Sequence, residues 1–154
     1  MKKHHVLFTK IKDLLKSNFG ADLKEYDEGT HLTINDSGIW IDCDDSQLTI
    51  GYGLAHTHYN PDYDNIHNAV ENFFDLLTKR KRITIYYKGS FQFKNITEFV
   101  ISDSEYEHVG TSKTWLYPYW KKTHTKVKLI EPLLDSSKIL NEIEEIKNYA
   151  HTAL

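Results

Sequence analysis

The chain has 154 residues, of which 40% are hydrophobic and 27% charged, and its formal net charge is -3. This composition is that of a globular protein with a substantial core, which excludes a disordered chain, and the length fits one domain over residues 1–154. The negative charge argues against a nucleic-acid partner held by neutralisation of phosphates.

The sequence also limits the compartment. A single cysteine, Cys43, excludes an intrachain disulfide and fits a reducing cytosol. Charged residues interrupt residues 1–15, so we expect no secretion signal. No segment reaches the roughly 20 apolar residues of a membrane span. We therefore expect a cytoplasmic protein with no membrane partner.

The first third of the chain predicts one helix and three strands. Apolar residues recur at helical spacing over residues 4–19, and Gly20 follows as a helix stop. Apolar and polar residues then alternate over 30–34, 38–43 and 47–52, as in half-buried strands. Short runs rich in Asp, Asn and Ser separate these strands, which predicts an antiparallel meander.

A second helix is expected over about residues 64–79. Asp62 or Asp64 is placed to cap its first turn, since a carboxylate accepts hydrogen bonds from unpaired helix amides. The basic run at 79–82 follows its last turn, where cations interact favourably with the helix dipole. We interpret this run as a solvated helix end and not as an RNA-binding patch.

The second half predicts further strands and a last helix. The expected elements are a hairpin around Gly89-Ser90, a strand over 96–102, a hairpin across Gly110, a strand over 125–130 and a helix from Asp135 or Ser136. Grouped strands with short connections predict an α+β fold, in the order α-β3-α-β4-α. We expect an antiparallel sheet of about six to seven strands with three helices.

The stretch HTHYNPDYDNIHN, residues 56–68, raises the possibility of a metal site. His56 and His58 are one residue apart, so their side chains share a face if the segment is extended. Asp62 or His67 could complete a zinc-type ligand set. Because the sequence has no HExxH and no CxxC, we expect ordinary surface histidines, with no metal and no other cofactor. The alternative is a metal site formed by His56, His58, Asp62 and His67.

His58 and Cys43 are the two candidates for a catalytic residue. His58 with Asp62 or Asp64 has the chemistry for acid–base catalysis, because histidine titrates near neutral pH. Cys43 could act as a nucleophile beside a histidine, but it lies on the apolar face of its predicted strand. A buried, inert thiol is the interpretation that this pattern favours.

A surface for a protein partner is the preferred kind of site. Tyr and Trp are favoured interface residues, and acidic groups accelerate encounter with a basic partner. An aromatic corner packed on the sheet, with acidic residues in solvated turns, is the structural alternative. The candidate partner-binding residues are Tyr117, Tyr119 and Trp120 in the stretch LYPYWKK, with Asp44, Asp45, Asp103 and Glu105 in two acidic stretches.

Residues 51–89, GYGLAHTHYNPDYDNIHNAVENFFDLLTKRKRITIYYKG, resemble a pattern in small bacterial cytosolic proteins. Several of these look like immunity proteins of polymorphic toxin systems. The residues that carry the resemblance are His56, His58, Tyr59, Asp62, Asp64, Leu76 and Leu77. The resemblance implies a non-catalytic protein that binds and neutralises a toxin, and it identifies neither the toxin nor the contact residues. A basic toxin is the partner that the two acidic stretches favour. A small metal-dependent or histidine-using hydrolase with its site at His56 and His58 is the alternative function.

Overall fold

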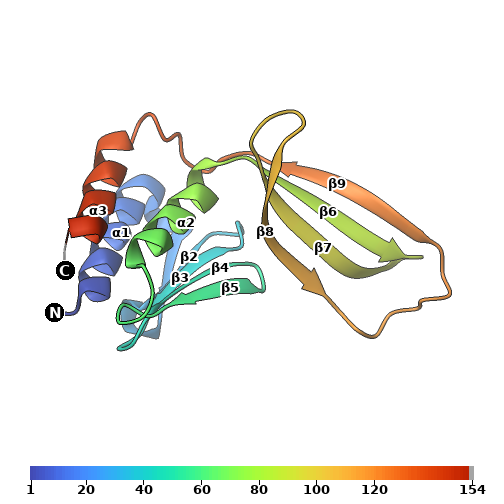
Figure 1. Ribbon diagram of the computed structural model, residues 1–154, viewed down its shortest axis with the longest axis horizontal. Helices are drawn as coiled ribbons and strands as arrows, with labels where there is room; N and C mark the ends of the chain where they lie inside the picture. The colour runs from blue at the N-terminus through green and yellow to red at the C-terminus, as the bar shows by residue number, and fades with distance from the viewer. Residues whose placement is uncertain (153–154) are drawn as a thin grey trace. The chain divides into compact units, whose positions relative to one another are not determined.

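The computed structural model describes residues 1–152, and the chain forms two compact units (Figure 1). Unit 1 comprises Met1–Leu77 and Leu134–Leu154, and unit 2 comprises Thr78–Leu133. Unit 2 is therefore an insertion in the chain of unit 1. The α+β class with three helices is confirmed, but the described residues form nine strands in two antiparallel sheets, not six to seven in one.

Unit 1 is an antiparallel meander covered by helices. Its strands follow each other in the order β1-β2-β3-β4-β5, each antiparallel to the next. The first predicted helix and the three predicted strands are confirmed with bounds shifted by one residue. The elements are α1 (Lys3–Phe19), β1 (Leu23–Tyr26), β2 (His31–Ile34), β3 (Ile39–Cys43), β4 (Leu48–Tyr52), β5 (Ala55–Tyr59), α2 (Ile66–Thr78) and α3 (Leu140–Thr152).

The sequence missed the two edge strands of this sheet. β1 reads LKEY and β5 reads AHTHY, so neither has the apolar alternation that marks a strand. Both form because a neighbour offers a complete ladder: β1 pairs with β2 from Leu23 to Tyr26, and β5 pairs with β4 from Ala55 to Tyr59. Polar edge strands depend on pairing and not on their own pattern.

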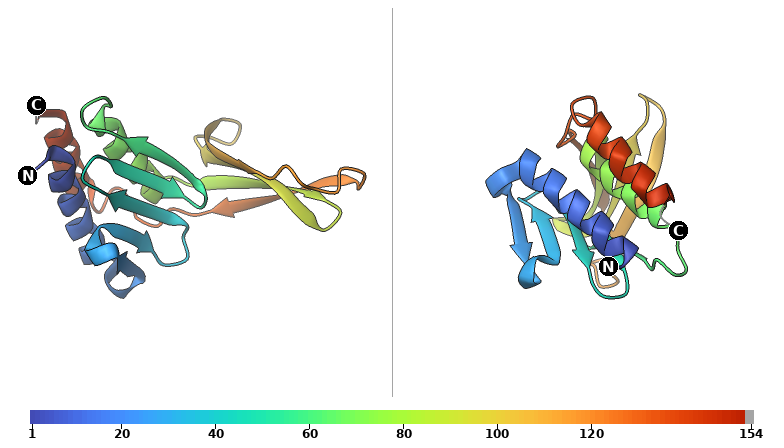
Figure 2. Two further views of the ribbon diagram at one scale, coloured as in Figure 1. Left: turned by 90° about the horizontal axis from the view of Figure 1, so that it is seen from below. Right: turned by 90° about the vertical axis from the view of Figure 1, so that its left-hand side faces the viewer.

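One face of the sheet in unit 1 packs on the helices. In β3, Ile39, Ile41 and Cys43 are buried, while the residues between them are only half-buried. α1 contributes Leu7 and Ile11 to this core, and neither side chain is exposed at all. α1 and α3 lie side by side (Figure 2). The core therefore lies between the helices and one face of the meander, and the other face meets solvent.

Two helix starts differ from the prediction. The amide of His67 donates to Asn65 Oδ1 at 3.0 Å, so Asn65 caps α2 and neither Asp62 nor Asp64 does. The last helix begins at Leu140 and not at 135 or 136, because Asp135 forms a turn instead. Its carboxylate accepts from the amide and hydroxyl of Ser137, and these donors lower the pKa of Asp135.

Unit 2 is a single antiparallel sheet in the order β8-β7-β6-β9. Its strands are β6 (Lys81–Lys88), β7 (Phe91–Val100), β8 (Tyr106–Lys113) and β9 (Thr123–Ile130). The hairpin around Gly89-Ser90 is confirmed. The other expected hairpin is wrong: residues 96–100 continue β7, the turn falls at 101–105, and Gly110 lies inside β8 beside a register shift at Thr97/Glu98.

The sheet of unit 2 is a single layer. Residues 79–133 contain no helix, and Phe99 is their only buried hydrophobic side chain. Seven of the eight residues of β9 are exposed, among them Val127 at 61% and Leu129 at 50%. Exposed apolar side chains of this kind often mark interaction surfaces when they are contiguous. Unit 2 therefore has exposed apolar side chains and little core of its own.

Candidate functional site

The aromatic loop, residues 114–122, joins β8 to β9 at the end of the unit 2 sheet that also carries the β6–β7 turn. Trp115 is 93% exposed, Tyr119 75% and Trp120 72%. Trp120 is thus a surface residue, and the alternative of an aromatic corner packed on the sheet does not apply to it. Only Tyr117, which is half-buried, packs on the strands.

This loop has a defined shape although its rings are exposed. The amide of Thr114 donates to the carbonyl of Phe93 at 2.9 Å, and the amide of Gly89 donates to the carbonyl of Lys122 at 3.1 Å. The Tyr117 ring stacks on Phe93 with centroids 4.6 Å apart. Two further backbone hydrogen bonds close turns inside the loop. The loop is therefore held at both ends and at its centre.

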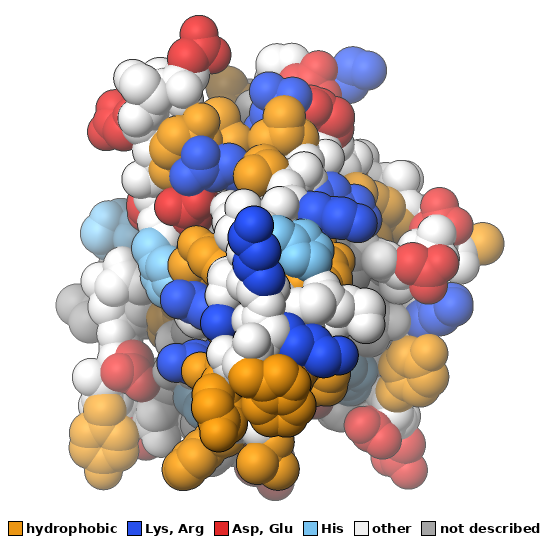
Figure 3. Space-filling model, turned by 90° about the vertical axis from the view of Figure 1, so that its right-hand side faces the viewer, with side chains coloured by type: hydrophobic (Ala, Val, Ile, Leu, Met, Phe, Trp, Pro, Cys, Tyr) orange, Lys and Arg blue, Asp and Glu red, His pale blue; other side chains and the backbone are white. Residues whose placement is uncertain are grey.

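A small pocket opens beside the loop. It has a volume of about 380 Å³ and is lined by Lys113, Thr114, Trp115 and Tyr117. Two aromatic walls with a lysine suit a planar or acidic side chain from a partner. Figure 3 shows lysine and arginine side chains gathered in the middle of this end of unit 2, with hydrophobic side chains beside them.

The charges of the two units have opposite signs. Unit 2 contains eleven Lys and Arg residues against five Asp and Glu residues, a formal net charge of +6. Unit 1 contains eight Lys and Arg residues against seventeen Asp and Glu residues, a net charge of -9. The chain's value of -3 is the sum of these two. Composition of the whole chain hides this separation.

The predicted partner-binding residues belong to different loops and to both units. Asp103 lies in the β7–β8 turn and Glu105 directly before β8, at the end of the unit 2 sheet opposite the aromatic loop. A ten-residue strand such as β7 spans about 30 Å. Asp44 and Asp45 lie in the β3–β4 turn of unit 1. The candidates therefore fall on three separate loops: the aromatic loop, the β7–β8 turn and the β3–β4 turn.

His56 and His58 lie at the edge of unit 1, on the solvent face of β5. Their rings are 5.0 Å apart, and the His56 ring is 5.8 Å from Trp40, which reaches across Gly51 of β4. His58 Nδ1 is 2.9 Å from Thr49 Oγ1. The pair is thus part of an aromatic row on an exposed part of the sheet face.

The other two members of that metal set lie elsewhere. His67 belongs to α2, where its Nε2 is 3.4 Å from Glu71 and its ring stacks on His151 at 4.1 Å. Asp62 lies in the loop before α2. Among residues 1–152, the group that gathers three His, Cys or acidic ligand atoms within 4.8 Å consists of His4, His5 and Cys43, and it includes none of these four residues.

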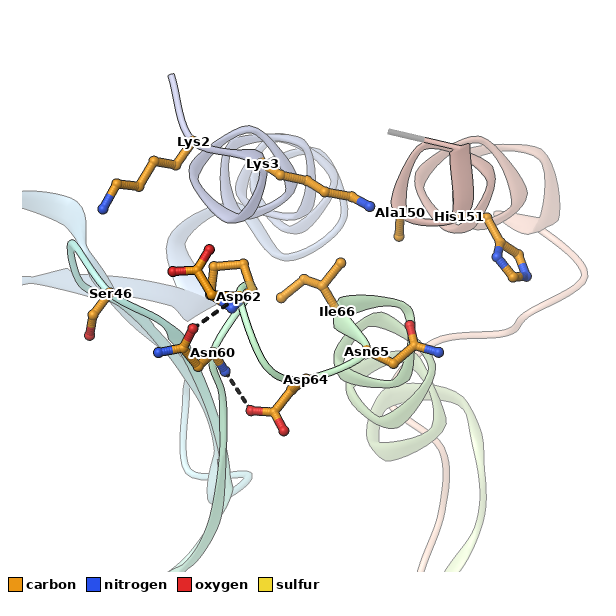
Figure 4. Close-up of a pocket in the computed structure, with 11 residues that line it drawn as sticks. Lys2, Lys3, Ser46, Asn60, Asp62, Asp64, Asn65, Ile66, Ala150 and His151 are labelled. Carbon is orange, nitrogen blue, oxygen red and sulfur yellow. Dashed lines mark hydrogen bonds between the residues drawn. The ribbon is translucent and has the colours of Figure 1, made fainter. Parts of the chain in front are cut away.

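The loop between β5 and α2 instead lines a polar pocket of about 640 Å³ (Figure 4). Lys2 and Lys3 line it from the start of α1, and His151 lines it from the end of α3. The carboxylate of Asp64 accepts from the Asn60 amide at 2.8 Å, so it is engaged in shaping the loop. The pairing of His58 with Asp62 or Asp64 that acid–base catalysis requires is absent from the contacts of the described residues.

The group that does converge consists of His4, His5 and Cys43. One nitrogen of each imidazole and the Cys43 Sγ lie within 4.8 Å of one another. His4 Nε2 and His5 Nε2 both donate to the carbonyl oxygen of Asp44 at 3.0 Å. Cys43 Sγ is 3.9 Å from the same oxygen. No local motif in the sequence marks this cluster, because the two histidines lie about 40 residues from the cysteine.

Burial sets the ionisation of this cluster. His4 is fully buried, and burial lowers its pKa, so its neutral form is favoured. Burial, followed by the charges of Asp42, Asp44 and Asp45, raises the pKa of Cys43 to about 12. The expectation that Cys43 is buried is confirmed, at 5% exposed. In the metal-free protein it is a protonated thiol.

Comparison of the chain with protein-family models, curated proteins and solved structures finds no match. None of the three helices within residues 1–152 combines the length and the apolar character of a membrane span. The aromatic loop and the His4–His5–Cys43 cluster are the two candidate sites.

Proposed function

We propose that this chain is a non-catalytic protein-binding protein whose contact surface is the aromatic loop of unit 2. The observation that carries the proposal is the exposure of Trp115, Tyr119 and Trp120 on a loop held in place by backbone hydrogen bonds. Large rings exposed to water are unfavourable unless a partner covers them, and a preformed loop loses little entropy when it binds.

The charge around the loop selects an acidic partner surface. Lys113, Lys121 and Lys122 belong to or adjoin the loop, and Lys88 ends the neighbouring strand. Acidic groups on a partner would be attracted to these ammonium groups, which would raise the association rate and make it depend on salt. Asp44 and Asp45, which led the sequence analysis to a basic partner, belong to unit 1 and would serve a separate contact.

The narrower form of the proposal is an immunity protein in the cytoplasm of a bacterium, with a toxin as partner. It rests on the resemblance of residues 51–89 alone. That segment runs from β4 to the β6–β7 turn and includes only two residues, Lys88 and Gly89, next to the aromatic loop. The resemblance therefore supports the proposed class of protein, and the aromatic loop supports the proposed position of the contact surface.

The test is a binding measurement with the product of the adjacent gene in the source genome. Trp120→Ala should weaken binding by roughly 2 kcal/mol, about 30-fold, the usual size of a hot-spot truncation. The matched control is Tyr63→Ala, which removes a ring that is 88% exposed but lies in unit 1. It should leave the affinity unchanged.

Salt dependence provides the second measurement. Lys121→Gln with Lys122→Gln should slow association at low salt and flatten its salt dependence, with little effect on dissociation. Unchanged binding in a Trp115→Ala/Trp120→Ala variant would reject the loop as the contact surface. Binding of a single-stranded oligonucleotide with the same Trp120 dependence would replace the protein partner with nucleic acid, because stacked rings among lysines also suit bases.

A further inference from the structure

The His4–His5–Cys43 cluster lies in unit 1 and has no part in the proposed contact surface. We propose that it is a binding site for a thiophilic transition-metal ion such as Zn²⁺, with one imidazole nitrogen each from His4 and His5 and the thiolate of Cys43 as ligands. Imidazole and thiolate are the ligand types that zinc prefers, and three protein ligands leave a fourth position open.

The ligand atoms are close to the spacing that such an ion requires. They lie within 4.8 Å of one another, whereas a tetrahedral zinc with bonds of 2.0–2.3 Å separates its ligand atoms by about 3.5 Å. Binding therefore requires a contraction of about 1 Å. His5 is only half-buried and sits in the first turn of α1, so its side chain has room to move.

An unpartnered nitrogen supports the assignment. A carbonyl oxygen only accepts, so the bond from His4 Nε2 to the Asp44 oxygen fixes the proton on Nε2. The lone pair of His4 Nδ1 then has no hydrogen-bond partner among the described residues, although the side chain is fully buried. Histidines that bind metals commonly donate their other ring nitrogen to a backbone carbonyl, as His4 does here.

The surrounding charge favours a cation. A pocket of about 500 Å³ beside the cluster is lined by Met1, His5 and Cys43, together with Asp42, Asp44 and Asp45 among others. These carboxylates offset two unfavourable charges, the positive end of the α1 dipole and the Lys2 ammonium, which bonds to the Asp45 carbonyl at 2.6 Å. On binding, the Cys43 proton would leave to solvent and the thiolate would donate its electron pair to the ion.

The experiment uses the full chain without an affinity tag, stripped of metal with a chelator and titrated with Co²⁺. One equivalent should bind and give the charge-transfer absorption of a cobalt–thiolate bond, and Zn²⁺ should displace it. Cys43→Ser should abolish the absorption and weaken Zn²⁺ binding by at least roughly 100-fold, since even outer ligand partners are worth 10- to 100-fold.

Two further variants separate this site from the rival histidines. His5→Ala, which changes a half-buried side chain, should weaken binding in a protein with an unchanged circular dichroism spectrum. His56→Ala/His58→Ala, the matched control, should bind cobalt as the wild type does. Absence of the thiolate absorption in wild-type protein overturns the proposal even if Cys43→Ser does not fold. Metal binding lost only in the control variant overturns it too and moves the site to β5.

Discussion

Unit 1 and unit 2 use their hydrophobic residues in opposite ways. In unit 1 the helices bury one face of a five-stranded sheet, and Phe73, Leu7 and Ile11 have no exposed surface. In unit 2 a four-stranded sheet buries one hydrophobic residue, and its largest rings face water. Burial stabilises a fold, whereas exposed rings are accessible for contact. The comparison assigns stability mainly to unit 1, and the contact surface proposed above lies in unit 2.

The largest expected effect contrasts a buried ring with an exposed one. Phe73→Ala in α2 should lower the free energy of unfolding by about 3–5 kcal/mol, because it leaves a cavity in the core of unit 1. Trp120→Ala removes a larger ring but should change the free energy of unfolding by no more than about 0.5 kcal/mol, because that ring is exposed. Urea denaturation followed by circular dichroism measures both. A destabilisation of similar size in the two variants would remove the distinction between the units.

The same unfolding curves test whether the chain is one cooperative domain, as its length predicts. If it is, the fluorescence of Trp40 in unit 1 and that of Trp115 and Trp120 in unit 2 should report coincident transitions, measured in variants that keep only one set of tryptophans. Separate transitions, with unit 2 unfolding first, would show that unit 1 stays folded without unit 2 and that the chain is not one cooperative domain.

Lys81 is the charged exception in unit 2 and should give the next largest effect. It is 1% exposed, and burial lowers its pKa to about 8. Below pH 8 the lysine is charged in both states, and between about 8 and 10.5 the unfolded chain holds more protons than the folded one. Stability should therefore rise with pH across this window.

The measurement compares wild type with Lys81→Met. The difference in their free energies of unfolding should shift in favour of wild type by up to about 3 kcal/mol between pH 8 and 10.5. Titration of the tyrosines is common to both proteins and cancels. A difference that is independent of pH would mean that Lys81 keeps an ordinary pKa and that its end of the sheet is open to water.

Gly51 tests how the solvent face of unit 1 is built. A Cβ at this position would overlap the Trp40 ring, which lies across β4 at Gly51. Gly51→Ala should therefore cost about 1–3 kcal/mol by displacing the ring. In a Trp40→Val background the same substitution should cost much less, because the pair is coupled. Equal costs in both backgrounds would mean that the ring moves aside freely.

The sequence predicted the local elements of unit 1 better than the division of the chain. The meander of β2, β3 and β4 could be predicted because each strand alternates between core and solvent. Residues 83–100 also alternate, but most side chains of β6 and β7 are half-buried on both faces of a single sheet, so alternation there does not mark a core. Nothing in a local pattern reports that β8 and β9 flank β7 and β6 in one separate sheet.

The sites show the same limit. Tyr117, Tyr119 and Trp120 could be singled out because they lie in one segment without periodicity, but that pattern left open whether the rings pack on the sheet. Tyr119 and Trp120 are exposed, whereas Tyr117 stacks on Phe93. The His4–His5–Cys43 cluster could not, since it requires the start of α1 to lie over the end of β3. His56 and His58 of β5 were candidates because histidines and aspartates are dense in residues 56–68. In the structure the other candidate ligands lie on different elements, His67 in α2 and Asp62 in the loop before it.

The smallest expected effect compares two ion pairs within unit 2. Arg82 donates from Nε and Nη2 to Glu98 Oε2 at 3.1 and 2.7 Å, and its guanidinium lies 3.3 Å from the centre of the Tyr106 ring. Lysine provides neither the fork nor the flat stacking surface, so Arg82→Lys should destabilise the protein by about 1 kcal/mol.

Arg80 bonds to Glu131 at 2.8 Å, but these side chains are 44% and 71% exposed, against 27% and 21% for Arg82 and Glu98. Arg80→Lys, the matched control, should cost about 0.3 kcal/mol or less, since water screens exposed pairs. Equal losses in the free energy of unfolding, measured by urea denaturation, would indicate that water screens the Arg82–Glu98 pair as well. The side chains around Tyr106 would then give that pair no protection from solvent.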